Sequence, residues 1–274
     1  MSMISDITIG QYYKGDSFVH KLDPRAKIIL TILFVVMIFL CKNFINLALV
    51  LFFILISVAV SKVPFKMFTK SLKPIVPIVL FTAVINIFYI TGGRELLSLG
   101  FIKITEKGLY TAVFMAIRII FLIISSSLLT YTTVPTQLTD AIERLLSPLK
   151  IFHIPVHTLA MMMTLALRFI PTLIEEVERI TNAQRARGAD FESGSFLDKI
   201  KSLIPVLIPL FISAFRRAYE LSYAMTCRCY TGGEGRTRMK QMKMKISDFV
   251  SIAIFIAGIV AVLLLNRYIG VAVI

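Results

Sequence analysis

Two arginines in this chain have surroundings that suit a docking side chain. Arg187 is the centre of the run 186–188, Ala-Arg-Gly, and Arg228 is the centre of the run 227–229, Cys-Arg-Cys. A guanidinium presents a planar fork of donors that can bind a carboxylate through two parallel hydrogen bonds. Short flanking residues leave that fork accessible, so the chemistry indicated is recognition of an acidic partner. The candidate docking residues are Ala186, Arg187, Gly188, Cys227, Arg228 and Cys229.

Helix capping gives a second explanation of the same residues. Cations are favoured at the negative end of a helix dipole, and a glycine such as Gly188 often supplies the left-handed residue that closes a helix. The two explanations are compatible, because a capping arginine at an exposed helix end still presents its guanidinium to a partner.

Other reactive side chains do not form a recognisable site. His153 and His157 are four residues apart, but Pro155 lies between them and neither a carboxylate nor a thiol is near in sequence. Cys227 and Cys229 alone are too few and too close for a zinc site. The sequence contains no phosphate-binding G-x-x-x-x-G-K-[ST], no H-E-x-x-H and no G-x-S-x-G motif. We therefore expect no catalytic residue, bound metal or cofactor in this chain.

Composition assigns the chain to the membrane. Apolar residues make up 57% of it, charged residues 17%, and the mean hydropathy is +0.82, values typical of a multi-pass membrane protein. The net charge of +14 does not indicate nucleic-acid binding, because the basic residues lie between apolar runs and form no continuous patch. Three cysteines give no disulfide framework.

Five apolar stretches predict transmembrane helices: 28–41, 44–60, 74–91, 108–130 and 246–265. The first is short for a span of about 20 residues, although Lys27 and Lys42 can extend it by snorkelling. Asp23 and Pro24 suit the cap and first turn of this helix. The domains expected are an N-terminal arm, 1–27, four spans within 28–130, a domain of amphipathic helices, 131–245, and a last span within 246–274.

Basic residues predict the orientation in the membrane. Segments 1–27, 61–73 and 131–245 together hold 24 of the 30 lysines and arginines, which places them on the cytoplasmic side and the loop 92–107 outside. Arg118 is left within a span, where a charge is a functional-site hypothesis by default. The alternative is a structural role, with Arg118 paired to backbone or to the serines at 125–127.

The segment 131–245 predicts three amphipathic helices, at 135–150, 155–190 and 196–230. The second and third begin apolar and end charged. Their apolar halves, 156–174 and 203–215, can also be interpreted as spans, which would give seven. We favour helices that start at the membrane and extend into water, because prolines interrupt the second half. The fold class expected is all-α, a multi-pass membrane protein with about five transmembrane helices plus three amphipathic helices on the cytoplasmic side.

Several longer runs carry a family resemblance that spans essentially the whole chain. They are His20-Lys21-Leu22-Asp23-Pro24-Arg25, Arg168-Phe169-Ile170-Pro171-Thr172-Leu173, Ala183-Gln184-Arg185-Ala186-Arg187-Gly188-Ala189, Ala214-Phe215-Arg216-Arg217-Ala218 and Arg228-Cys229-Tyr230-Thr231-Gly232-Gly233-Glu234-Gly235-Arg236-Thr237. With them the chain resembles the transmembrane T component of energy-coupling factor (ECF) transporters, related to the membrane subunits of cobalt and biotin uptake systems. In that family, two Ala-Arg-Gly-like motifs end the coupling helices and engage two ATP-binding-cassette (ABC) ATPases. The run 186–188 matches in full, whereas 227–229 keeps only the arginine.

The resemblance implies a non-catalytic coupling subunit of an ATP-driven vitamin or micronutrient importer in the plasma membrane. Its partners would be two ABC ATPases, which bind the ATP, and one membrane S component, which binds the substrate and topples to release it inside. The apolar stretches 135–150, 156–174 and 203–215 of the coupling helices would form the platform for that S component, and adaptable methionines suit such a surface as well as they suit an ordinary core. The candidate platform residues are Leu138, Ile142, Leu145, Met161, Met162, Met163 and Leu207. The rival functions are a self-contained secondary transporter, for which no inverted repeat or intramembrane ion pair is evident, and a membrane enzyme, for which a nucleophile–base set is lacking.

Overall fold

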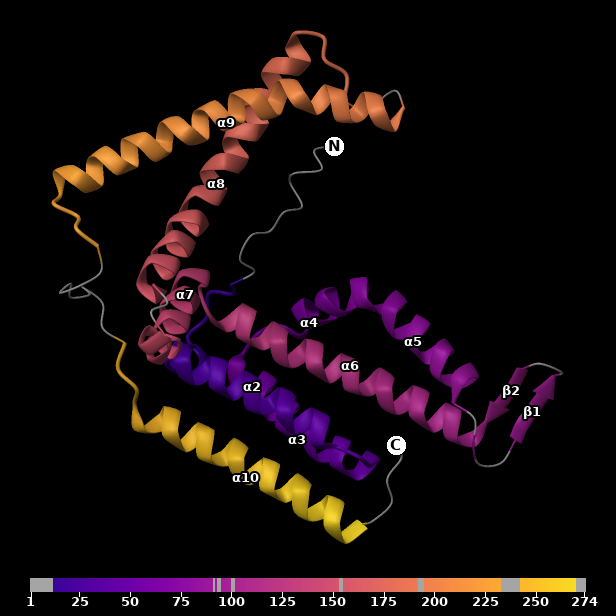
Figure 1. Cartoon of the computed structure of the whole chain (residues 1–274). Coiled ribbons are helices and arrows are strands. Elements are labelled where there is room, and N and C mark those ends of the chain that lie inside the picture. The colour runs from indigo at the N-terminus through magenta and orange to yellow at the C-terminus, as the bar shows by residue number, and fades with distance from the viewer. Residues whose placement is uncertain are drawn as a thin grey trace. The chain divides into compact units, whose positions relative to one another are not determined.

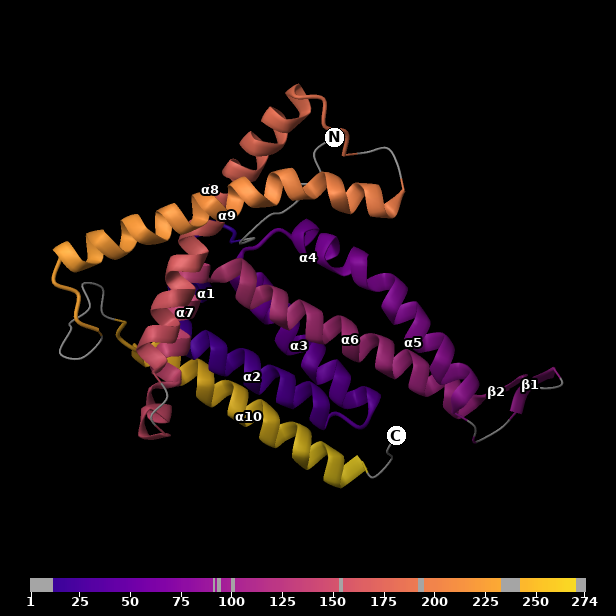
Figure 2. The same cartoon turned by 45° about the horizontal axis from the view of Figure 1, so that its top comes forward.

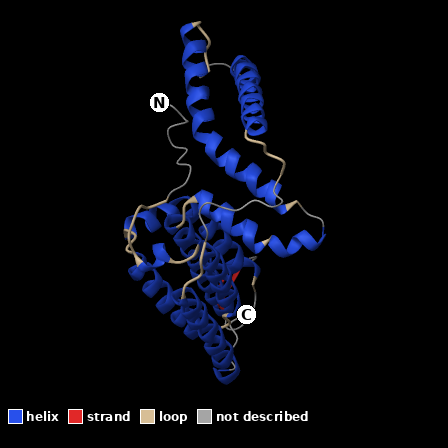
Figure 3. Ribbon diagram, turned by 90° about the vertical axis from the view of Figure 1, so that its left-hand side faces the viewer, coloured by secondary structure: helices blue, strands red, loops and turns tan. Residues whose placement is uncertain are grey.

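The computed structural model describes residues 12–90, 92, 95–99, 102–152, 155–191, 195–232 and 242–269, and almost all of its regular structure is helical (Figures 1 and 3). The chain divides into two compact units. The core unit comprises residues 10–141 and 241–274, and the helix-pair unit comprises residues 1–9 and 142–240. The predicted all-α class is confirmed, with the addition of one short antiparallel hairpin in the predicted outer loop.

The elements follow one another as α1 (Phe18–Lys21), α2 (Pro24–Leu40), α3 (Phe44–Ser61), α4 (Phe65–Leu72), η1 (Lys73–Ile75), α5 (Val76–Tyr89), β1 (Glu95–Leu99), β2 (Ile102–Thr105), α6 (Glu106–Thr132), α7 (Pro135–Leu145), η2 (Ser147–Phe152), α8 (Val156–Ala186), α9 (Phe196–Cys227) and α10 (Ile246–Ile269). Of the three predicted coupling helices, the second and third form as α8 and α9. The first is shorter than the predicted 135–150: α7 ends at Leu145 and a 3-10 turn follows. Pro148 explains the difference, because proline restricts the residue before it and has no N–H to continue the helix.

Five described helices are long and apolar enough to cross a membrane: Phe44–Ser61, Phe65–Tyr89, Glu106–Thr132, Val156–Ala186 and Ile246–Tyr268. Four of them coincide with predicted spans. The predicted span 28–41 is not among them, because α2 has only 17 residues. The fifth is α8, whose apolar first half qualifies by length and composition. The number of such helices matches the predicted five, and the span over 28–41 stays a prediction.

The starts of α2 and α10 are held together by a buried carboxylate, that of Asp248. The Asp23 side chain accepts a hydrogen bond from the Arg25 N–H at 2.9 Å, with Pro24 in the first turn, so the predicted cap forms. Asp248, only 1% exposed, accepts the Asp23 N–H at 2.9 Å and the Lys245 N–H at 2.7 Å. This one carboxylate therefore fixes the N-terminal ends of both helices against each other.

The core unit packs α2 against α6 and α10, and α3 against α6 (Figure 1). Its buried cluster is apolar and draws on all four helices; it comprises Phe34, Met37, Ile38, Cys41, Leu47, Val50, Ile54, Phe114, Phe121 and Val262. By contrast α5 lies along α6 and has no buried residue. A helix that is apolar all round yet exposed to this extent is one that faces hydrocarbon.

Arg118 closes the C-terminal end of α2. Its Nη2 donates to the Cys41 carbonyl at 2.7 Å, and its guanidinium lies over the Phe114 ring at 4.8 Å from the centroid. The neighbouring carbonyl, Leu40, accepts from Asn266 Nδ2 at 2.8 Å. The last carbonyls of a helix have no intrahelical donor, so these two side chains supply what the end of α2 lacks. The structural alternative, pairing of Arg118 with backbone, is confirmed.

We expect Arg118→Ala to lower stability and yield without a specific effect on partners. The substitution leaves the buried Cys41 carbonyl without its donor, a loss of about 1–3 kcal/mol. The measurement is thermal unfolding of the purified protein in detergent. Arg267→Ala, at an exposed arginine in the last turn of α10, is the matched control and should unfold at the wild-type temperature. Equal melting of the two variants would contradict this role.

Candidate functional site

The two candidate docking runs close their helices in the same way. At the end of α8, Gly188 N–H donates to the Arg185 carbonyl at 2.9 Å and Ala189 N–H to the Gln184 carbonyl at 3.0 Å. At the end of α9, Cys229 N–H donates to the Thr226 carbonyl at 2.9 Å and Tyr230 N–H to the Met225 carbonyl at 3.0 Å. Both are the Schellman closure, in which a left-handed residue turns the chain back over its last carbonyls.

The arginine occupies the same position in both closures. Arg187 and Arg228 are the C-cap residues of α8 and α9, and each is exposed. The following residue is left-handed in each case, with φ of 91° at Gly188 and 52° at Cys229. The departure of 227–229 from the Ala-Arg-Gly pattern therefore leaves the backbone unchanged. Each helix end presents an exposed guanidinium next to the negative pole of the helix dipole.

Cys229 adopts a left-handed conformation, which residues other than glycine and asparagine seldom take. We expect Cys229→Val to fray the last turn of α9, because a β-branched residue in this region costs about 1–3 kcal/mol. Hydrogen exchange of the Tyr230 amide measures the effect and should be faster in that variant. Cys229→Gly should retain the protection of the Tyr230 amide. Cys227→Val, at the last residue of α9, is the control and should also retain it. If Cys229→Val leaves the exchange rate of the Tyr230 amide unchanged, the left-handed conformation of residue 229 does not stabilise the end of α9.

Helices α8 and α9 pack antiparallel within the helix-pair unit. Arg217 on α9 pairs with Glu176 on α8 at 3.4 Å, and Gln184 Nε2 donates to the Pro205 carbonyl at 3.3 Å. The second contact follows from the sequence of α9: Pro209 has no N–H, so the Pro205 carbonyl four residues earlier lacks its intrahelical donor. A side chain of α8 supplies it. Pro209 thus leaves a carbonyl of α9 free to bind a side chain of α8.

The antiparallel packing separates the two arginines. Figures 1 and 2 show α8 and α9 crossing, with their C-terminal ends directed away from each other. The Arg187 end lies toward the N-terminal half of α9, and the Arg228 end lies toward the N-terminal half of α8. Tyr230 makes this second contact directly, since its hydroxyl donates to Met161 Sδ at 2.9 Å. The residue that follows a candidate docking run is therefore joined to a candidate platform residue by one hydrogen bond.

The candidate platform residues on α8 and α9 are largely accessible. Met162 is 52% exposed, Met163 is 44% exposed and Leu207 is 46% exposed, whereas Met161 is half-buried. The exposed apolar face of α9 lies within the predicted platform stretch 203–215, of which only Leu207 was among the named candidates, and its members recur every three or four residues, the helical period. That face comprises Leu203, Ile204, Leu207, Ile208, Phe211, Ile212 and Phe215. A contiguous exposed apolar surface of this kind marks a partner or membrane contact.

On α7, Leu138, Ile142 and Leu145 follow one another at helical spacing and are all half-buried. Of the two histidines considered as a metal site, only His157 lies within the described residues. His157 Nδ1 lies 3.0 Å from Glu143 Oε1, a carboxylate distant in sequence, and His153 lies outside the described residues. Among the residues that the structure describes, no group of three or more potential metal ligands occurs.

Comparison with known proteins gives a consistent result over most of the chain. Residues 15–239 match the family model CbiQ, described as cobalt transport protein. Proteins named energy-coupling factor transporter transmembrane protein EcfT are similar to this chain: that of Ruminiclostridium cellulolyticum is 54% identical over 264 residues, covering 96% of this chain and 98% of the relative. The protein of Clostridium kluyveri is 52% identical, covering 91% and 93%. That of Bacillus subtilis is 44% identical, covering 88% and 91%. With its apolar helices and this match, the chain is a multi-pass membrane protein that belongs to the CbiQ family.

Proposed function

We propose that this chain is the transmembrane coupling subunit, the T component, of an ATP-driven importer of the energy-coupling factor type. It holds no nucleotide and performs no chemistry of its own. Two ABC ATPase subunits bind and hydrolyse ATP, and each receives one of the exposed helix ends at Arg187 and Arg228. A membrane S component, which captures a vitamin or another micronutrient, binds the candidate platform residues.

One observation carries the proposal. Two long helices end in the same closure, and each closure places an exposed arginine at its cap. A single capping arginine is ordinary, but a repeated one on two packed helices suits two copies of one kind of partner. The expected contact in each ATPase is a carboxylate, which binds a guanidinium through two charge-assisted hydrogen bonds.

The contacts between α8 and α9 suit the transmission of motion. When the ATPases close on ATP, the two helix ends move with them. The Glu176–Arg217 ion pair and the Gln184–Pro205 hydrogen bond hold the helices together at their crossing. The Tyr230–Met161 hydrogen bond links one docking end to the methionines. Displacement of either end is therefore delivered to the apolar surface on which the S component sits.

Charge supports the orientation that this function requires. The N-terminal arm and the segment 131–245 are proposed to face the cytoplasm of a cell whose plasma membrane holds the other helices, since lysine and arginine accumulate in these segments. The helix ends then lie on the side where ATP is available. In this arrangement α8 starts at the membrane and extends into water.

Native mass spectrometry of the complex purified through a tag on this chain tests the proposal. We expect one copy of the chain with two ATPase subunits and one small membrane protein, and ATP-dependent uptake after reconstitution of this complex into vesicles. The chain reconstituted by itself should move no solute. If it leaves the membrane without any ATPase and still transports a solute, it is a secondary transporter and the proposal is wrong.

A further inference from the structure

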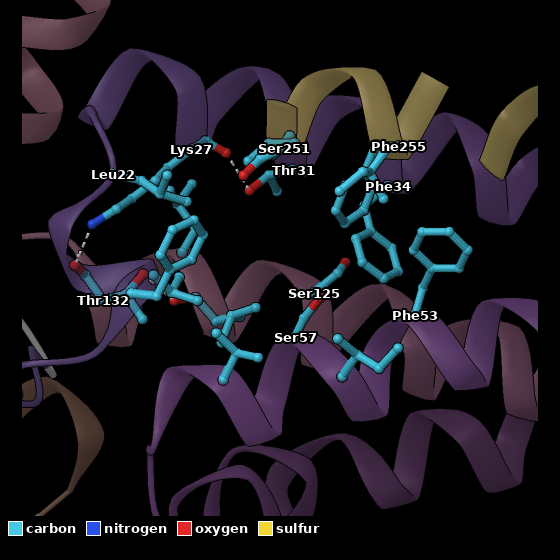
Figure 4. A pocket seen from close by; sticks show the side chains of 18 of the residues that line it. Leu22, Lys27, Thr31, Phe34, Phe53, Ser57, Ser125, Thr132, Ser251 and Phe255 are labelled. Carbon is cyan, nitrogen blue, oxygen red and sulfur yellow. Dashed lines mark hydrogen bonds between the residues drawn. The ribbon is translucent and has the colours of Figure 1, made fainter. Parts of the chain in front are cut away.

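The core unit contains a half-open cavity of about 290 Å³ between α2, α3, α6 and α10, with α1 at one end. Figure 4 shows its two ends: Leu22, Lys27 and Thr132 at one, and the rings of Phe34, Phe53 and Phe255 at the other. The ring centroids of Phe34 and Phe53 lie 5.0 Å and 5.4 Å from that of Phe255, so the rings close that end. The site described above does not include any residue of this cavity.

Most polar groups of the cavity wall are engaged with the protein itself. Lys27 Nζ donates to the carbonyls of His20 and Thr132, at 3.1 Å and 2.8 Å. The hydroxyls of Thr31, Ser125 and Ser251 donate to carbonyls of their own helices at 2.8–2.9 Å. Since these donors are already satisfied, the cavity offers a ligand mainly apolar contact, and a polar substrate would leave its own groups unpaired there.

The wall is buried and the mouth is apolar and exposed. On the wall, Phe34 is 4% exposed and Ser125 is 5% exposed. At the mouth, Phe52 is 62% exposed, Ile56 is 46% exposed and Ile254 is 53% exposed. These mouth residues belong to α3 and α10, two helices long and apolar enough to cross the membrane. The medium that meets the mouth is therefore the hydrocarbon of the bilayer.

The size of the cavity distinguishes between the two apolar groups that could enter it from a bilayer, a transmembrane helix and an acyl chain. The cavity extends along α2 from Lys27 to Phe34, which is about 10 Å at the helical rise and about a third of the hydrocarbon thickness. A transmembrane helix is about 10–12 Å across with its side chains, too wide for a cavity of about 290 Å³. A single acyl chain is narrow enough to enter and lies along the same axis.

We propose that this cavity is a binding site for one acyl chain of a membrane phospholipid, held between α2, α3 and α10. The methyl end of the chain lies against the three phenylalanine rings, and the headgroup lies beyond the Lys27 end, next to the polar N-terminal arm. The bound chain completes the packing between α3 and α10. This site is independent of the ATPase-docking ends.

The test uses vesicles of phosphatidylethanolamine and phosphatidylglycerol, in which some phosphatidylglycerol carries a diazirine near the end of one acyl chain. After reconstitution of the full-length protein, unlabelled vesicles are added to exchange loosely associated lipid before irradiation. We expect the peptides with Phe34, Phe53 and Phe255 to retain label, and the exposed residues of α5, such as Phe81, to lose it. Peptide mass spectrometry locates the adducts.

Variants that fill the cavity decide the result. Ser125→Leu places a larger side chain on the buried wall, and we expect a several-fold loss of retained label in the cavity peptides. Ser126→Leu, an exposed serine next to it on α6, makes the same change outside the cavity and should have no effect. Ser57→Phe fills the cavity from α3 and serves if Ser125→Leu does not fold, as judged by size-exclusion chromatography.

Two results would overturn the proposal. In the first, the cavity peptides lose label during exchange as fast as the peptides of α5, and neither filling variant reduces the labelling of the cavity peptides. The other is retained labelling that disappears when the membrane partner is reconstituted with the chain, because side chains of that protein would then occupy the cavity.

Discussion

Reversal of both capping charges, Arg187→Glu with Arg228→Glu, should abolish recovery of the ATPase subunits with this chain and eliminate ATP-driven uptake. Each substitution replaces an ion pair across the proposed interface with two facing carboxylates, and loss of one partner of such a pair costs about 2–5 kcal/mol. The single variants should each weaken recovery, and the double variant should be worst. The measurements are the amount of ATPase per tagged chain and the uptake rate in vesicles.

A matched control reverses the same number of charges, one on α8 and one on α9, at positions away from the helix ends. Arg179→Glu with Arg216→Glu changes two exposed arginines within α8 and α9, away from the helix ends. This pair should retain most of the recovery and the uptake. If the end variants retain wild-type recovery and uptake, Arg187 and Arg228 only cap their helices.

A second large effect is expected at the methionines of α8. Met162→Asp with Met163→Asp should remove the S component from the purified complex while both ATPases remain. The two side chains are 52% and 44% exposed, so the helix accepts the change, but a carboxylate buried without a partner in an apolar contact is strongly unfavourable. Purification through a tag on this chain, followed by quantification of each subunit, measures the result.

Replacement of the same residues by leucine is the control for the methionine prediction. Met162→Leu with Met163→Leu keeps the surface apolar at similar volume, and the S component should remain bound. Recovery of the S component with the aspartate pair would place the contact elsewhere, and the exposed face of α9 that includes Phe211 and Phe215 is then the next surface to change.

Local signals in the sequence were sufficient for much of the fold. The change from apolar to charged residues along 155–190 and 196–230 located α8 and α9, and the ends of both helices fall within a few residues of the predicted ones. Asp23 and Pro24 marked the start of α2 correctly. These features depend on helical periodicity and on chemistry within one turn, both of which a sequence displays directly.

Features that depend on distant contacts could not be predicted in this way. The partner of Arg118 is a backbone carbonyl at the end of another helix, Cys41, and a carbonyl has no signature in a sequence. The same holds for the Pro205 carbonyl, which requires both a proline four residues later and a glutamine on α8. The left-handed conformation of Cys229 is also hidden, because its residue type gives no reason to expect it.

The sites themselves were predictable to different degrees. The position of Arg187 and Arg228 at helix ends followed from the sequence, and the structure adds that the two closures share one hydrogen-bond pattern. The named platform residues took only Leu207 from the predicted stretch 203–215 and left out neighbours such as Phe211 and Phe215, because apolar residues in a membrane protein do not reveal whether lipid, core or a partner covers them. Only their exposure in the helix-pair unit distinguishes them.

The native cysteines that flank Arg228 allow the most direct test of the central claim. Cys227 and Cys229 are exposed and Cys41 is buried, so a membrane-impermeant maleimide reports on the α9 end without any substitution. We predict no labelling from outside intact cells, strong labelling in inverted vesicles stripped of ATPase, and protection when the ATPase subunits are added back. Labelling from outside, or equal labelling of inverted vesicles with and without ATPase, would contradict the account.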